Sequence, residues 1–141
     1  MTELKIGLLR NTVSDTLEIL RESPLGAAFF DVDYFSSTVE AFSIFNHPSE
    51  CYPPRVLCYM DNIISRAEFP INEFVGELAA ITHFNQMHDK KKTGKLYAFH
   101  CKRRQVAAWN YKMFLFQDFG HPEYSVPVRE SRNEKTKLRD Y

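Results

Sequence analysis

The fold is decided by the stretch Phe29-Phe30-Asp31-Val32-Asp33-Tyr34-Phe35-Ser36-Ser37-Thr38, in which an apolar run precedes two carboxylates and a helix start. The apolar run, residues 26–31, is short enough to favour a buried strand, although periodicity alone does not separate it from a helix. Ser37 and Glu40 have the spacing of a capping box and predict a helix that begins at Ser37. In an open α/β sheet, ligands bind outside the carboxyl ends of the strands. Asp31 and Asp33 would lie at the carboxyl end of this strand.

A second apolar run, residues 55–61, also ends on polar groups, Asp61 and Asn62. If the two strands are parallel neighbours, their carboxyl ends lie side by side, and oxygen ligands converge as Mg²⁺ or Ca²⁺ requires. The predicted metal site then consists of Asp31, Asp33, Asp61 and Asn62. In the alternative interpretation these side chains only cap loops, as Asp and Asn commonly do.

Strands and helices alternate along the rest of the chain. Residues 4–9 predict a strand, and Thr12 caps the helix that follows it. The longest predicted helix opens after Phe69-Pro70, includes Phe74, and ends in the solvated lysine run 90–92. Two further predicted strands, residues 95–100 and 111–119, form an antiparallel hairpin at the sheet edge, joined by the polar, aromatic stretch 101–110. This order indicates a three-layer α/β fold with a mostly parallel sheet closed by a C-terminal hairpin.

Composition restricts the class of protein. The length of 141 residues predicts one domain, residues 1–125, followed by a charged, flexible tail, residues 126–141. A formal net charge of zero argues against nucleic acid or an anionic membrane surface as a partner. No apolar run reaches the roughly 18 residues that span a bilayer, and the first residues do not resemble a signal peptide. Cys51, Cys58 and Cys101 form no Cys-x-x-Cys motif, which favours reduced thiols in the cytoplasm.

The histidines and the tryptophan give weaker signals. His83 and His88 are five apart on a predicted helix and therefore lie on different faces, unlike the usual zinc ligands. His100 is the better candidate for substrate contact because it ends a predicted strand and leads into the hairpin loop; the alternative is a solvent-facing strand end. Trp109, in the same loop, either stacks on a sugar or base or is a half-buried structural anchor.

The segment from Asp31 to Thr38 resembles the Asp-x-Asp-x-Tyr-x-Ser-Thr segment of macrocin O-methyltransferase-like proteins. These form a metal-dependent branch of the class I S-adenosylmethionine-dependent methyltransferases that methylates sugars of natural products. In that branch the next strand ends with two aspartates, and Asp61 and Asn62 take that place here. The resemblance implies that Asp31 or Asp33, Asp61 and Asn62 occupy the Mg²⁺ positions of the family. The amide of Asn62 lowers the expected affinity because it carries no charge.

The resemblance covers nearly the whole chain but only about half of the family's fold, a partial Rossmann-like arrangement. The sequence contains no Gly-x-Gly, so the family's glycine-rich cofactor turn has no counterpart. We therefore expect S-adenosylmethionine to bind no more tightly than roughly millimolar, about 4 kcal/mol. The resemblance implies a degenerate methyltransferase, or one that needs a partner chain for metal-assisted O-methyl transfer. The alternative is a non-catalytic interaction module or a homodimeric structural protein without a cofactor.

In the family's fold the strand that corresponds to residues 26–31 lies in the middle of the sheet, so the resemblance implies that one of its sides lacks a pairing partner here. Proteins usually cover such an edge. The predicted strand 4–9 can cover it within the same chain or by reaching into a neighbouring subunit. The resemblance favours the second arrangement, a homodimer, because these two strands are not adjacent in the family's fold; the other possibility is a companion chain that completes the sheet.

Overall fold

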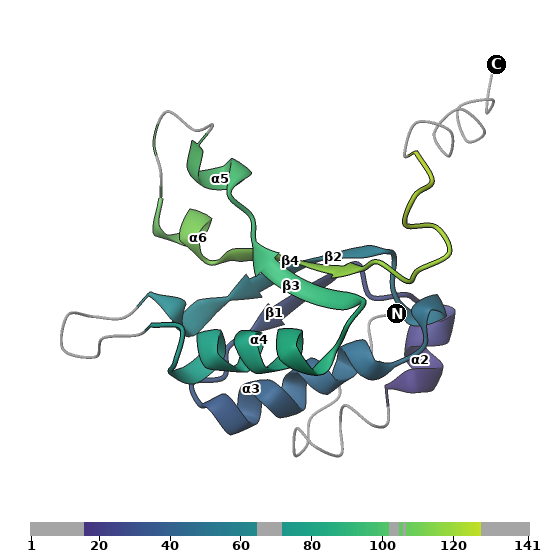
Figure 1. Cartoon of the computed structure of the whole chain (residues 1–141), viewed down its shortest axis with the longest axis horizontal. Coiled ribbons are helices and arrows are strands. Elements are labelled where there is room, and N and C mark those ends of the chain that lie inside the picture. The colour runs from purple at the N-terminus through teal and green to yellow at the C-terminus, as the bar shows by residue number, and fades with distance from the viewer. Residues whose placement is uncertain (1–15, 65–71, 102–104, 106, 128–141) are drawn as a thin grey trace.

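The structure is a computed structural model and describes residues 16–64, 72–101, 105 and 107–127 (Figure 1). The predicted strand 4–9, its helix cap Thr12, and all of the predicted tail except residues 126 and 127 lie outside these ranges.

Four strands form one mixed sheet in the order β1-β2-β4-β3 (Figure 1). They are β1 (Ala27–Phe30), β2 (Arg55–Met60), β3 (Lys91–Lys95) and β4 (Met113–Asp118). β1 pairs with β2 in parallel, whereas β4 pairs antiparallel with both β2 and β3. Three strands therefore run in the same direction, and β4, the last along the chain, lies between two of them. An antiparallel pairing near the C-terminal end is confirmed, but it joins β4 to residues 91–95 and not to the predicted strand 95–100.

One face of the sheet is covered by the helical layer, in which α3 (Phe35–Phe42) packs beside α4 (Gly76–Met87) (Figure 1). The shorter α2 (Leu17–Glu22) contributes Leu20 to the same core. Three 3-10 turns, η1 (Ser43–Asn46), η2 (Ser49–Cys51) and η3 (Asp61–Ile63), border the sheet. The core is aromatic, and the ring of Phe45 stacks on Phe116 with centroids 4.0 Å apart.

No described helix covers the middle of the opposite face of the sheet, which we call the open face. Phe29 of β1 is 79% exposed there, and its ring centroid lies 5.9 Å from that of Tyr59 in β2. At the far end of this face, Tyr124 lies 4.2 Å from the guanidinium of Arg55. The three-layer arrangement expected from the sequence is therefore a two-layer arrangement over the described residues.

Two predicted helix starts are wrong. α3 begins at Phe35, before Ser37, and the side chain that ties it to the preceding loop is Thr38, whose Oγ1 donates to the carbonyls of Tyr34 and Val32. α4 begins only at Gly76, so Phe74 precedes the helix and is exposed. Gly76 has φ +58°, and a Cβ atom there would lie 3.2 Å from the Asp33 carbonyl oxygen. This left-handed residue defines where the helix can start.

Lys91 and Lys92 of the predicted helix end belong to β3, because α4 already ends at Met87. The predicted strand 95–100 is also wrong. The chain leaves the sheet after Lys95 and forms α5 (Ala98–Cys101) and α6 (Ala108–Tyr111) before β4. β3 forms without apolar side chains because its polar groups have partners. The Asn85 side chain of α4 bonds both the N–H and the carbonyl of Thr93. Lys92 Nζ donates to carbonyls at the end of α4, where a cation is favourable.

Candidate functional site

The carboxyl ends of β1 and β2 lie side by side because the two strands pair in parallel, with Phe30 opposite Met60. We call this region the strand tips. Asn62 Nδ2 donates a hydrogen bond to Asp31 Oδ1 at 3.2 Å, so two of the predicted site residues are in direct contact. Asp33 is exposed in the loop that passes the start of α4.

Glu77, in the first turn of α4, connects the two strand tips. Its side chain is buried, with a relative exposure of 1%. Oε2 accepts the backbone N–H of Asn62 at 3.0 Å, and Oε1 accepts that of Val32 at 3.5 Å. Burial raises the pKa of Glu77 from 4.5 to about 7, although the two backbone hydrogen bonds oppose that shift. A carboxyl group with this pKa changes its charge near neutral pH.

Asp61 forms an ion pair with Lys112, at the start of β4. Lys112 Nζ lies 2.7 Å from Asp61 Oδ1, which also accepts the Tyr59 hydroxyl at 3.2 Å. The hydrogen bond from Lys112 lowers the pKa of Asp61, and the same bond raises the pKa of Lys112. The carbonyl of Lys112 accepts the Met60 N–H at 2.9 Å, which holds the Lys112 backbone beside the end of β2. An ammonium group paired with Asp61 therefore lies at the end of β2.

A divalent cation at the strand tips would need several oxygen ligands that are free to bind it. Asp61 already binds an ammonium and a hydroxyl group, and Asn62 directs its amide N–H₂, not its oxygen, towards Asp31. In the described ranges, no group of three or more His, Cys, Asp or Glu side chains is placed to hold a metal ion. Mg²⁺ needs several oxygen ligands in a near-octahedral arrangement. The side chains as they are arranged do not fit it.

The sequence did not indicate Glu77 or Lys112 as site residues. Glu77 follows a glycine at a helix start, where an acidic side chain is favourable, and that signal could have pointed to it. Lys112 is 51 residues from its partner in sequence, and no local pattern links the two. Both roles arise from the tertiary arrangement.

The two predicted substrate residues lie in the connection between β3 and β4. His100 falls within α5, and its side chain is outside the described part of the chain. Trp109, in α6, is 37% exposed and packs against Phe99 with ring centroids 5.9 Å apart. This contact supports the alternative of a half-buried structural anchor.

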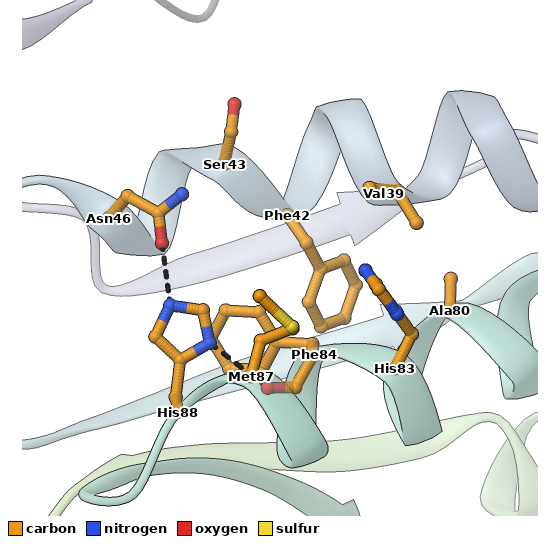
Figure 2. Close-up of a pocket in the computed structure, with 9 residues that line it drawn as sticks. All are labelled: Val39, Phe42, Ser43, Asn46, Ala80, His83, Phe84, Met87 and His88. Atoms are coloured by element: carbon orange, nitrogen blue, oxygen red, sulfur yellow. Dashed lines mark hydrogen bonds between the residues drawn. The ribbon is translucent and has the colours of Figure 1, made fainter.

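A groove of about 280 Å³ lies between α3 and α4 (Figure 2). His83 and His88 both line it, which corrects the expectation of different faces, because α4 ends at Met87 and His88 follows it. His88 Nδ1 lies 3.0 Å from the Phe84 carbonyl oxygen, and Nε2 lies 2.9 Å from Asn46 Oδ1 (Figure 2). Both ring nitrogens of His88 have protein partners, and among the described residues the groove holds no group of three or more side chains placed to bind a metal ion.

Comparison with known proteins gave no relative: no protein-family model, no curated protein and no solved structure matches this chain. Within the described ranges, none of the helices has the length and apolar character needed to cross a bilayer. The function is therefore inferred from the geometry of the chain and from the resemblance of its Asp31 to Thr38 segment.

Proposed function

We propose that this chain is a methyltransferase-related α/β module in which Lys112 takes the place of the bound cation at the strand tips. We further propose that it transfers no methyl group without a second polypeptide. The strand order supports the relationship, because the carboxyl end of class I methyltransferases has parallel βα units closed by an antiparallel hairpin. The observation that carries the proposal is the 2.7 Å pair between Lys112 and Asp61.

The chemistry of the two cations differs. In metal-assisted O-methyl transfer the metal orients a hydroxyl group and lowers its pKa as a Lewis acid. The Lys112 ammonium supplies one positive charge and hydrogen-bond donors, but it has no open coordination position. It can neutralise Asp61 and hold the carboxyl end of β2 close to the start of β4. The strand tips thus keep the acidic residues of the family's site and use them for internal pairing.

Lys112→Met is expected to raise the affinity of the strand tips for Mg²⁺ about tenfold, roughly 1.4 kcal/mol. Methionine fills similar space, removes the competing positive charge, and leaves Asp61 Oδ1 free to bind a cation. Isothermal titration of the purified full chain with MgCl₂ measures the change. Lys95→Met is the matched control, because the Lys95 ammonium lies over the Tyr111 ring and not against Asp61. Equal affinities in the wild-type and Lys112→Met proteins would contradict the proposal.

The isolated chain is expected to bind S-adenosylmethionine no more tightly than roughly millimolar, with or without Mg²⁺. The reason is that the sequence has no Gly-x-Gly turn to bring the backbone close to the cofactor. Calorimetric titration of S-adenosylmethionine into the full chain is the measurement. Micromolar binding by the chain alone, or methyl transfer to a sugar hydroxyl without a partner, would show that the proposal is wrong.

A second candidate function is a non-catalytic interaction module. The specific observation in its favour is the open face, on which Phe29 of the edge strand β1 is exposed next to Tyr59. Contiguous exposed apolar surface marks interaction sites. Under this alternative the Lys112→Met variant still gains affinity for Mg²⁺. The chain, however, transfers no methyl group even when a second polypeptide is added.

A further inference from the structure

β1 is a short edge strand of the described sheet, and its own side chains carry none of the charges or prolines that usually block pairing. Its residues Ala27, Ala28, Phe29 and Phe30 include no charge and no proline. Among the described residues only β2 pairs with it, and none of them forms a ladder with the outer side of β1. Natural proteins normally block such an edge with lysine, proline or a bulge. The side chains of β1 therefore do not block hydrogen bonding between this strand and a further strand.

The side chains of β1 are complementary to a second copy of themselves. Two copies related by a two-fold axis can pair only antiparallel, and opposed residues must lie on the same face of the sheet. If the axis passes through Ala28, then Ala27 lies opposite Phe29 of the partner subunit, a small residue against a large one. Beyond the strand, Asp31 lies opposite Leu25 of the partner subunit, so no two carboxylates are opposed.

The surroundings of the edge permit this approach. A Cβ atom built on Gly26 would meet nothing within 4 Å, so the space at the start of β1 is open. The chain carries no net charge, and two copies therefore do not repel each other at long range. Phe29 and Tyr59 form an apolar pair on the open face next to the edge, and the two pairs would become neighbours across the axis.

We propose that two copies of this chain pair antiparallel through β1 and join their four-stranded sheets into one continuous sheet. The inference does not depend on a methyltransferase relationship, since it rests on β1 and the open face alone. Because only one short strand from each copy forms the contact, the dimer dissociates on dilution. The pairing also places the strand tips of the two copies on opposite ends of the joined sheet.

Sedimentation velocity of the full chain from about 5 μM to about 500 μM is the first test. The mass should rise from 16.5 kDa towards twice that value. Phe29→Lys should weaken the dimer at least tenfold, because it puts a charge opposite Ala27 of the partner subunit. Phe74→Lys is the matched control: the two phenylalanines are 79% and 80% exposed, but Phe74 precedes α4 and is not part of β1. A constant mass of 16.5 kDa, or a dimer that only Phe74→Lys disrupts, would overturn the inference.

Cysteine cross-linking tests the register without relying on a loss of affinity. Two single variants, Ala27→Cys and Phe29→Cys, are prepared in a Cys101→Ser background and mixed under mild oxidation. A disulfide between the two different variants is expected, while each variant alone should remain mostly uncross-linked. Efficient cross-linking of Phe29→Cys with itself would overturn the proposed register, and no cross-link at any concentration would overturn the pairing. Neither result bears on Mg²⁺ or S-adenosylmethionine binding.

Discussion

Replacement of Phe45 with alanine is expected to lower the free energy of unfolding by about 3–5 kcal/mol. Phe45 is fully buried in η1 and stacks on Phe116 of β4, with an interplanar angle of 8°. It also makes edge-to-face contacts with Phe42 of α3 and Phe84 of α4, so one ring joins the sheet to both main helices. A cavity there removes contacts with all three elements. The total free energy of unfolding of a small domain is about 5–15 kcal/mol, so this loss is a large share of it.

Urea denaturation of the two proteins measures this difference. Phe74→Ala is the matched control, because Phe74 is 80% exposed and its truncation should change stability by no more than about 0.5 kcal/mol. If Phe45→Ala lost no more stability than Phe74→Ala, the aromatic cluster would not be the core of this fold.

Glu77 is expected to make the protein less stable as the pH rises from about 4 to about 8. The pKa of Glu77 is about 7 in the folded protein and 4.5 for an unperturbed glutamate, so the folded state binds the proton more strongly. The stabilising effect of the proton is complete below pH 4.5 and is lost as the pH passes through 7. At roughly 1.4 kcal/mol per pH unit, this amounts to about 3 kcal/mol.

Glu77→Gln should remove most of that pH dependence, because a neutral amide replaces the carboxyl group and still accepts a backbone hydrogen bond. Denaturation at several pH values, with the wild type and the variant in the same buffers, compares the two profiles. Glu73→Gln is the control, since Glu73 is exposed before the start of α4 and its variant should keep the wild-type profile. A Glu77→Gln protein with an unchanged slope would contradict the assignment.

The sequence predicted the strands that have apolar side chains. β1, β2 and β4 were found because their runs of apolar residues are bounded by polar or turn residues. β3 was placed wrongly because Lys-Lys-Thr-Gly-Lys has no apolar residue, and its strand conformation depends on pairing with β4 and on the Asn85 side chain. Local pattern does not report a strand that tertiary contacts impose.

The candidate site was predicted in part. The contact between Asp31 and Asn62 follows from the parallel order of two strands, which the alternation of elements indicates. The partners of these tips could not be predicted, because Glu77 and Lys112 come from distant elements and are held there by backbone geometry. The sequence therefore located the acidic residues but not the groups that neutralise or bury them.

The position of β4 has a consequence for how the protein is made. β4 lies between β2 and β3, yet it is the last of the four strands to leave the ribosome. Until residues 113–118 emerge, the inner edges of β2 and β3 have no partner, and the ring of Phe116 is missing from the cluster around Phe45. Nascent chains that stop before this strand expose unpaired strand edges and apolar aromatic rings, both of which promote aggregation. Folding of this sheet must therefore wait until residues 113–118 have been synthesised, and messages cut short before the codon for Met113 should yield aggregates.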